Sequence, residues 1–162
     1  MKVIIVTGTP AAGKTTLAHA LSEALGYAYL DGWAVIDRYG LSEGYDEARG
    51  CQVVDEGAFA HAVKDEISRQ GAAGASGVVV DSHFSQDIDP SFVDICLVAT
   101  VPLDVLKSRL EARTYPPEKV KENLDAEVFE ICYIEAVEVG HRVRKVDCSA
   151  PLGKQALLDL CE

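Results

Sequence analysis

The sequence predicts an α/β protein with three layers, in which helices cover both faces of a five-stranded parallel sheet. Short β-branched apolar runs alternate with segments of helical periodicity, an order that favours parallel strands joined by right-handed crossovers. The chain has 162 residues, 48% of them apolar, so it can bury roughly 70% of its unfolded surface. Because no repeat or linker divides it, residues 1–162 are expected to form a single domain.

The first half of the chain is expected to supply three strands and two helices. Strands are expected at 2–7, 27–30 and 78–80, and helices at 14–25 and 55–70. Asp55 is placed to cap the second of these helices. Residues 31–54 show no clear period: glycines and polar residues dominate, and Trp33, Val35 and Ile36 are the apolar anchors.

The second half should complete the sheet with two strands and add three helices. Strands are expected at 93–100 and 144–148, and the last helix at 152–160. Pro102 opens a helix that the run Tyr115-Pro116-Pro117 breaks. A long helix then continues to about Val139, where Gly140 ends it.

Charge and composition exclude several classes of protein. Counting 15 basic and 26 acidic side chains gives 15 − 26 = −11, a poor match for a protein that wraps nucleic acid. No apolar run approaches the roughly 20 residues of a membrane span, and the N-terminus lacks a signal-peptide pattern. We therefore expect a cytoplasmic protein that binds neither membrane nor nucleic acid. The five cysteines form no CxxC pair, which argues against a zinc site.

The run from Gly8 to Thr15 fits the phosphate-loop pattern GxxxxGK[ST], with an apolar strand before it and a helix after it. Backbone N–H groups of such a loop hold phosphate oxygens, and the small Ala11, Ala12 and Gly13 leave room for that approach. Lys14 would reach the β- and γ-phosphates, and the Thr15 hydroxyl would hold Mg²⁺.

A second acidic position follows the strand at 78–80. Asp81 has the Walker-B placement and would hold Mg²⁺ through water; the alternative is a loop or cap carboxylate. His83 could position a water or the attacking phosphate, or be an ordinary loop histidine. No NKxD motif is present, and the DxxG match at 37–40 comes too soon after the loop, so a GTPase is not indicated.

Arginines are needed to stabilise charge on a transferring phosphoryl group. Arg109 and Arg113 are four residues apart on a helix that a proline pair interrupts, as expected of a short lid. The alternative is a solvated helix face. Arg38 and Arg49, in the irregular segment 31–54, are candidates for holding a second, acceptor phosphate.

These motifs resemble the adenylate kinase isoenzyme 6 family, in its archaeal form, over nearly the whole chain. The matching segments are GTPAAGKTTLA (8–18), GYDE (44–47), VVDEG (53–57), VVDSH (79–83), RLEARTY (109–115) and KVKENLDAEVFEICYIEA (119–136). The last two are more specific than the phosphate loop, which other P-loop proteins share.

The resemblance implies a P-loop nucleoside monophosphate kinase that converts Mg-ATP and AMP into two ADP, with an ATPase side activity. Residues 31–54 would bind the monophosphate and 112–122 would form the lid. Lys14, Asp81, His83, Arg109 and Arg113 would be catalytic. The residues that cradle ATP would be Ala11, Ala12, Gly13, Lys14, Thr15, Thr16 and Arg113.

Two departures from the family pattern stand out. Thr114 replaces a glycine that usually follows the lid arginine, and a β-branched residue is strained there if φ is positive. Thr100 replaces an arginine often found after an apolar pair; if that arginine holds phosphate, this chain is a weaker kinase.

Two other functions remain as alternatives. Eukaryotic relatives assist maturation of the small ribosomal subunit through a ribosomal protein, so an ATP-driven assembly factor is one; the negative charge suits a basic partner. A shikimate-type kinase is the other, against which the GYDE and RLEARTY segments argue. No dimerisation stripe is evident, so a monomer is expected.

Overall fold

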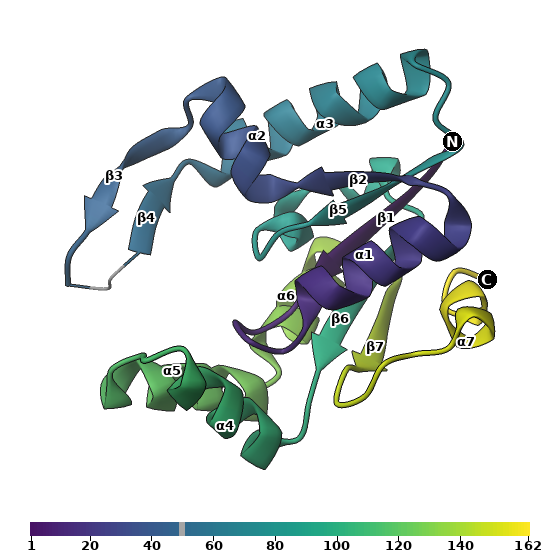
Figure 1. Cartoon of the computed structure of the whole chain (residues 1–162). Coiled ribbons are helices and arrows are strands. Elements are labelled where there is room, and N and C mark those ends of the chain that lie inside the picture. The colour runs from purple at the N-terminus through teal and green to yellow at the C-terminus, as the bar shows by residue number, and fades with distance from the viewer. Residues whose placement is uncertain (49–50) are drawn as a thin grey trace.

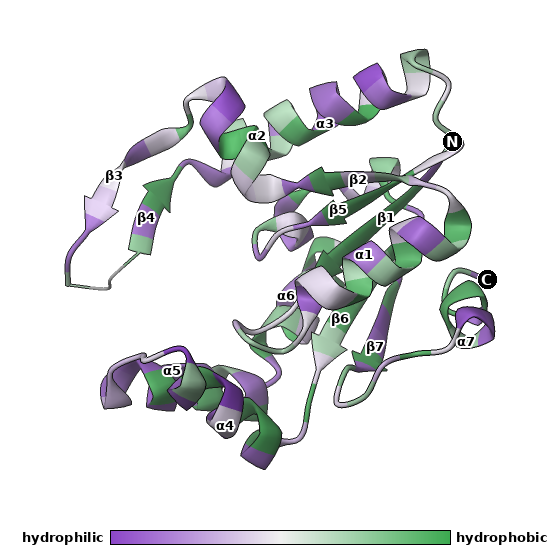
Figure 2. Cartoon of the chain, in the orientation of Figure 1, coloured by the Kyte–Doolittle hydropathy of each residue, from purple (hydrophilic) through white to green (hydrophobic). Residues whose placement is uncertain are grey.

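A computed structural model describes residues 1–48 and 51–162 and confirms the predicted class. Five strands form one parallel sheet in the order β2-β5-β1-β6-β7. They are β1 (Lys2–Thr7), β2 (Ala28–Asp31), β5 (Gly77–Asp81), β6 (Ile95–Thr100) and β7 (Val143–Asp147). Figure 1 shows the sheet at the centre of the molecule, and Figure 2 shows its inner strands as the most continuous apolar region.

Helices cover both faces of the sheet because successive residues of β1 point to opposite sides. Ile4 and Val6 pack in one core cluster, and Val3 and Ile5 pack in the other. The first cluster contains residues of α1 (Lys14–Leu25), α4 (Leu103–Ala112), α5 (Pro117–Val128) and α7 (Lys154–Asp159). The second contains residues of α2 (Gly32–Tyr39), α3 (Glu56–Ala72) and α6 (Ile131–Val139).

Among the described residues of the segment 31–54, only those at its start are helical. Asp31 caps α2 by accepting a hydrogen bond from the backbone N–H of Trp33 at 2.9 Å. Further along, β3 (Ser42–Asp46) and β4 (Cys51–Val54) pair as antiparallel strands that project away from the sheet (Figure 1). Arg49, a candidate for the acceptor phosphate, lies outside the described residues.

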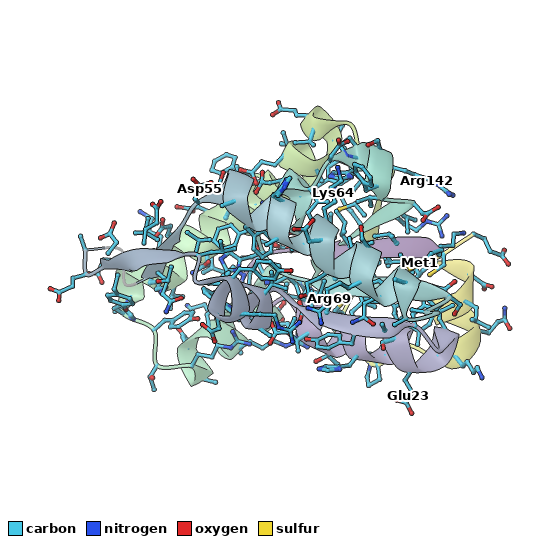
Figure 3. The ribbon with its side chains drawn as sticks, turned by 90° about the horizontal axis from the view of Figure 1, so that it is seen from above. Met1, Glu23, Asp55, Lys64, Arg69 and Arg142 are labelled. Atoms are coloured by element: carbon cyan, nitrogen blue, oxygen red, sulfur yellow. The ribbon has the colours of Figure 1, made fainter. Side chains whose placement is uncertain are left out.

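Helix α3 follows the hairpin and crosses the top of the molecule. Figure 3 shows Asp55, Lys64 and Arg69 following one another along it. Asp55 caps α3 as predicted, by accepting the N–H of Ala58 at 2.8 Å. After β5, two short 3₁₀ turns, η1 (Ser85–Asp87) and η2 (Pro90–Phe92), lead to β6.

The single long helix predicted to reach Val139 is wrong. It is two helices, α5 and α6, separated at Phe129 and Glu130, and Glu130 has φ of 53°. The break is required because Val120 of α5 belongs to one core cluster and Ala136 of α6 to the other. A straight helix could not pack in both. The Glu130 carboxylate also accepts a hydrogen bond from Lys145 of β7.

The turn after α4 contains the strain that the sequence indicated. Thr114 has φ of 56°, and its N–H donates to the Glu111 carbonyl at 3.0 Å.

Replacing Thr114 by glycine should raise the free energy of unfolding by up to about 1 kcal/mol, because glycine adopts this conformation without a Cβ clash. Urea unfolding measures the change. Thr114→Ala keeps the clash and is the control; a glycine variant no more stable than the alanine variant would contradict the expectation.

None of the helices in the described part of the chain is long and apolar enough to cross a membrane.

Candidate active site

The phosphate loop joins β1 to α1 through three residues with positive φ: Gly8 at 143°, Ala11 at 68° and Gly13 at 104°. Left-handed conformations of this kind occur in the backbone nests that bind anions. Gly13 is the N-cap of α1, with no side-chain cap and no acidic residue in the first turn. The free N–H groups at the start of α1 therefore favour a phosphate.

Lys14 lies within the loop that it is expected to serve. Its ammonium donates hydrogen bonds to the carbonyl oxygens of Gly8 at 2.8 Å and Thr9 at 3.3 Å. Burial lowers the pKa of Lys14 from its usual value. These two hydrogen bonds keep the Lys14 side chain at the loop. A phosphate bound there would favour the charged form of Lys14, because an opposite charge stabilises the ammonium.

One hollow of about 370 Å³ collects eight of the ten predicted site residues. Those eight are Ala11, Gly13, Lys14, Thr15, Thr16, Asp81, His83 and Arg113. Asp81 reaches it because β5 lies beside β1, with Asp81 paired to Val6. Arg113 reaches it as the C-cap of α4. Ala12 is fully buried behind the loop and does not line the hollow.

Tyr29 is a site residue that sequence reasoning missed. Its hydroxyl donates to Asp81 Oδ2 at 2.9 Å, and its ring stacks on His19 at 3.9 Å between centroids. Burial and then this hydrogen bond raise the pKa of Tyr29. The signal was indirect: β2 pairs with β5, so residues near the end of β2 must lie close to Asp81.

His83 follows β5 and lies among aromatic rings. Its centroid is 4.0 Å from that of Phe84 and 5.5 Å from that of Trp33. Burial, and after it the charge of Lys14, lower the pKa of His83 to about 4. The imidazole is therefore neutral at pH 7 and can both donate and accept a hydrogen bond.

This shift predicts a pH dependence of stability in the protein free of nucleotide and metal. Between pH 4 and 6.5 the unfolded chain binds a proton at His83 that the folded protein does not. The free energy of unfolding is therefore unaffected by protonation of His83 above pH 6.5, and it decreases as the pH falls from 6.5 toward 4. A His83→Asn variant should lose less stability over this range, as measured by urea unfolding at several pH values.

Asp87 changes stability in the opposite direction over this pH range, because burial raises its pKa to about 6. Asp87 is present in both proteins, so its effect cancels when their stability curves are compared. Parallel stability curves for the two proteins would contradict the expectation.

Arg109 lies apart from Arg113, beside the loop rather than over it. Its guanidinium donates to the carbonyls of Ala11 at 3.4 Å and Cys148 at 3.1 Å. It lines a second hollow of about 230 Å³, whose walls include Pro151 and Leu152. Gly13 and Thr16 line both hollows, so the two adjoin at the start of α1.

Arg38 is held elsewhere. Its guanidinium lies 2.8 Å from Oε1 of the buried Glu66, which Arg69 also contacts at 2.8 Å. This carboxylate joins α2 to α3, and Arg38 does not line the hollow of Lys14.

A further contact ties the loop to α5. The Thr9 hydroxyl donates to Glu127 Oε2 at 2.6 Å, and Glu127 Oε1 accepts the N–H of Val101 at 3.4 Å. Thr100, next to Val101, donates its hydroxyl to the Val146 carbonyl at 3.2 Å within the sheet. The sequence did not indicate that Glu127 supports the loop.

The parallel sheet, the loop before α1 and the acid at the end of β5 define a P-loop protein of the kinase type. Residues 4–130 match the domain family described as the AAA domain. The fold is similar to a sugar kinase from a Janibacter species (TM-score 0.64, 19% identity, 99% of this chain and 91% of that one). It is also similar to shikimate kinase from Acinetobacter baumannii (TM-score 0.58, 19% identity, 99% and 92%).

Comparison with proteins of similar sequence shows which P-loop family the chain belongs to. The chain is 34% identical over 146 residues to the "Putative adenylate kinase" of Thermococcus onnurineus, covering 90% of this chain and 74% of that protein. It is 33% identical over 135 residues to the adenylate kinase isoenzyme 6 homolog of Caenorhabditis elegans, covering 83% and 72%. The chain belongs to this family of adenylate kinase-like proteins.

Proposed function

We propose that the protein transfers the γ-phosphate of Mg-ATP to AMP and forms two ADP. The observation that carries this is the single hollow that joins Lys14, Asp81, His83 and Arg113 to the start of α1. The names of the relatives above support AMP as the acceptor.

The chain's own groups would act mainly by position and charge, because phosphoryl transfer asks for little covalent chemistry from the protein. The loop N–H groups and Lys14 would bind the β- and γ-phosphates. Arg113, at the start of the proposed lid at 112–122, would stabilise the charge on the moving phosphoryl group. Arg109 would act from the adjoining hollow, which would take the base of ATP between Arg109 and the apolar Pro151 and Leu152.

The site suits Mg²⁺. Thr15 and Asp81 line the same hollow and offer hydroxyl and carboxylate oxygens, the donors that this ion prefers. Tyr29 orients Asp81 through one carboxylate oxygen. Bound with ATP, the ion would neutralise charge on the β- and γ-phosphates.

The direct test measures ADP formation in mixtures of the protein, ATP and Mg²⁺. Each mixture contains AMP, CMP, GMP or UMP, and one mixture contains no acceptor. AMP should stimulate turnover at least about tenfold over hydrolysis alone, because the acceptor phosphate is a positioned nucleophile and water is not. Hydrolysis unchanged by every monophosphate would reject the kinase proposal.

A second candidate is an ATPase that binds a basic protein of the small ribosomal subunit. Six exposed apolar side chains lie at the end of α5, at its C-cap and along α6: Val128, Phe129, Ile131, Ile134, Val137 and Val139. Exposed apolar surface of this kind favours a protein partner, and the net charge of −11 favours a basic one. Failure to bind small-subunit ribosomal proteins at low and moderate salt would reject this candidate.

A further inference from the structure

Trp33 lies at the rim of the site and has no role in the mechanism above. The sequence gives the segment 31–54 three apolar anchors, Trp33, Val35 and Ile36. Val35 and Ile36 are 1% exposed, but Trp33 is 43% exposed. It lines the hollow of Lys14 from the first turn of α2. Ligand pockets are lined mainly by apolar and aromatic side chains, so a large exposed ring that lines a hollow is a candidate ligand contact.

The backbone places this ring firmly. At Gly32 a Cβ would lie 2.5 Å from Ser82 Cβ, so only glycine lets the start of α2 approach the turn after β5 this closely. The Asp31 carboxylate also accepts a hydrogen bond from the backbone N–H of Trp33 at 2.9 Å. The indole is therefore carried by a capped helix end packed against the Asp81–His83 turn, and it needs little ordering before it binds.

The other rings of the hollow already have partners. Tyr29 stacks on His19, and Lys119 lies over the Tyr115 ring at 4.7 Å. Trp33 makes only a tilted contact with His83, at 46° between the ring planes. Among the aromatic residues lining the hollow, Trp33 is the one with a large area available to a planar ligand.

Few basic side chains line the hollow in the described part of the chain. The basic ones are Lys14 and Arg113, and the acidic ones are Asp31 and Asp81. The mechanism above assigns both basic side chains to the nucleotide phosphates. Arg38 is engaged by Glu66, so among the described residues a contact to the base would be a further source of binding energy for the acceptor.

We propose that Trp33 determines acceptor specificity by stacking its indole on the base of the nucleoside monophosphate. This inference rests on the proposed kinase function and assigns a residue to its acceptor side. The strength of stacking depends on the area of the base and not on the hydrogen-bonding groups at its edges. The protein therefore accepts all four monophosphates and favours purines over pyrimidines.

Binding can be observed without turnover, because Trp33 is the only tryptophan of the chain. The ATP side is first filled with a non-hydrolysable ATP analogue and Mg²⁺. Titration with AMP should then quench the indole fluorescence to saturation. Ribose 5-phosphate, which lacks the base, should leave the fluorescence nearly unchanged at the same concentrations.

Kinetics of Trp33→Leu separate stacking from a structural role. The KM for AMP should rise roughly 5- to 150-fold, as expected for loss of one base–aromatic stack. The KM for ATP and the kcat at saturating AMP should change little. The preference for AMP over CMP in kcat/KM should fall, and Trp33→Phe should restore most of both. Phe92→Leu, an exposed aromatic 39% accessible on η2, is the matched control.

The outcomes distinguish this inference from the function on which it rests. If AMP is phosphorylated but Trp33→Leu keeps its KM for AMP and its base preference, the stacking proposal is overturned and the kinase stands. If no monophosphate stimulates turnover, the kinase proposal fails. In that case, quenching by AMP still supports stacking on a nucleotide, and its absence overturns it.

Discussion

Replacing Lys14 by methionine is expected to lower kcat by about 10²- to 10³-fold, the size of effect seen when a positioned group that stabilises transition-state charge is removed. Methionine keeps most of the apolar stem and removes the ammonium that contacts Gly8 and Thr9. Because burial already lowers the pKa of Lys14, the charge is costly to the folded state, and the variant should fold normally. Coupled ADP assays and thermal unfolding measure the two effects.

Lys107→Met is the matched control. Lys107 is exposed on α4 and makes a loose ion pair with Glu111 at 4.0 Å, so its loss should leave kcat within about twofold. Unchanged turnover in Lys14→Met would mean that the loop at 8–13 does not hold the transferring phosphate.

Replacing Gly8 by alanine should lower the free energy of unfolding by roughly 3–4 kcal/mol and abolish activity with it. Two effects add at this position. Its φ of 143° is rarely adopted by residues with a side chain, and a Cβ would lie 2.5 Å from the Ala99 carbonyl oxygen of the neighbouring strand β6. The sheet cannot move aside without breaking its ladder. Urea unfolding measures the loss.

Gly74→Ala separates the two effects. Gly74 also has positive φ, at 88°, but a Cβ there meets nothing within 4 Å. Its replacement should cost only about 1 kcal/mol, the conformational part. Equal losses in the two variants would show that the close approach of Gly8 to β6 contributes nothing.

The sheet order explains why two distant motifs form one site. Strand β1 lies between β5 and β6, so the loop after β1 emerges beside Asp81 at the end of β5. Ligands of such sheets bind beyond the carboxyl ends of the strands. Here Asp31 of β2 pairs with Asp81 of β5, which brings the start of α2 and Trp33 to the same end.

Much of this could be predicted because it depends on neighbours in sequence. The strands β1, β5 and β6 are short apolar runs, the α1 helix has a repeating leucine stripe, and the phosphate loop is a contiguous motif between β1 and α1. Asp81 was found because a carboxylate at the end of a buried strand is itself a local pattern. At Thr114, the resemblance placed a threonine where the family usually has glycine, and the strain expected there if φ is positive is present, since φ is 56°.

Other features had no local signal. The break at Glu130 contains neither glycine nor proline, and it exists because α5 and α6 pack on opposite faces of the sheet. Arg109 and Arg113 are four residues apart, yet α4 ends at Ala112, so the two side chains line different hollows. Tyr29 and Glu127 became visible only through contacts made 52 and 118 residues away along the chain.

The sequence by itself therefore determined the fold class, the phosphate loop and the family, because periodicity and contiguous motifs are properties of neighbouring residues. Tertiary structure alone decided which side chains share the hollow of Lys14, that Arg38 is held by Glu66, and that Trp33 is exposed at its rim. These depend on distances between segments that are remote in sequence, and those distances are set by strand order and by how closely helices pack on the sheet.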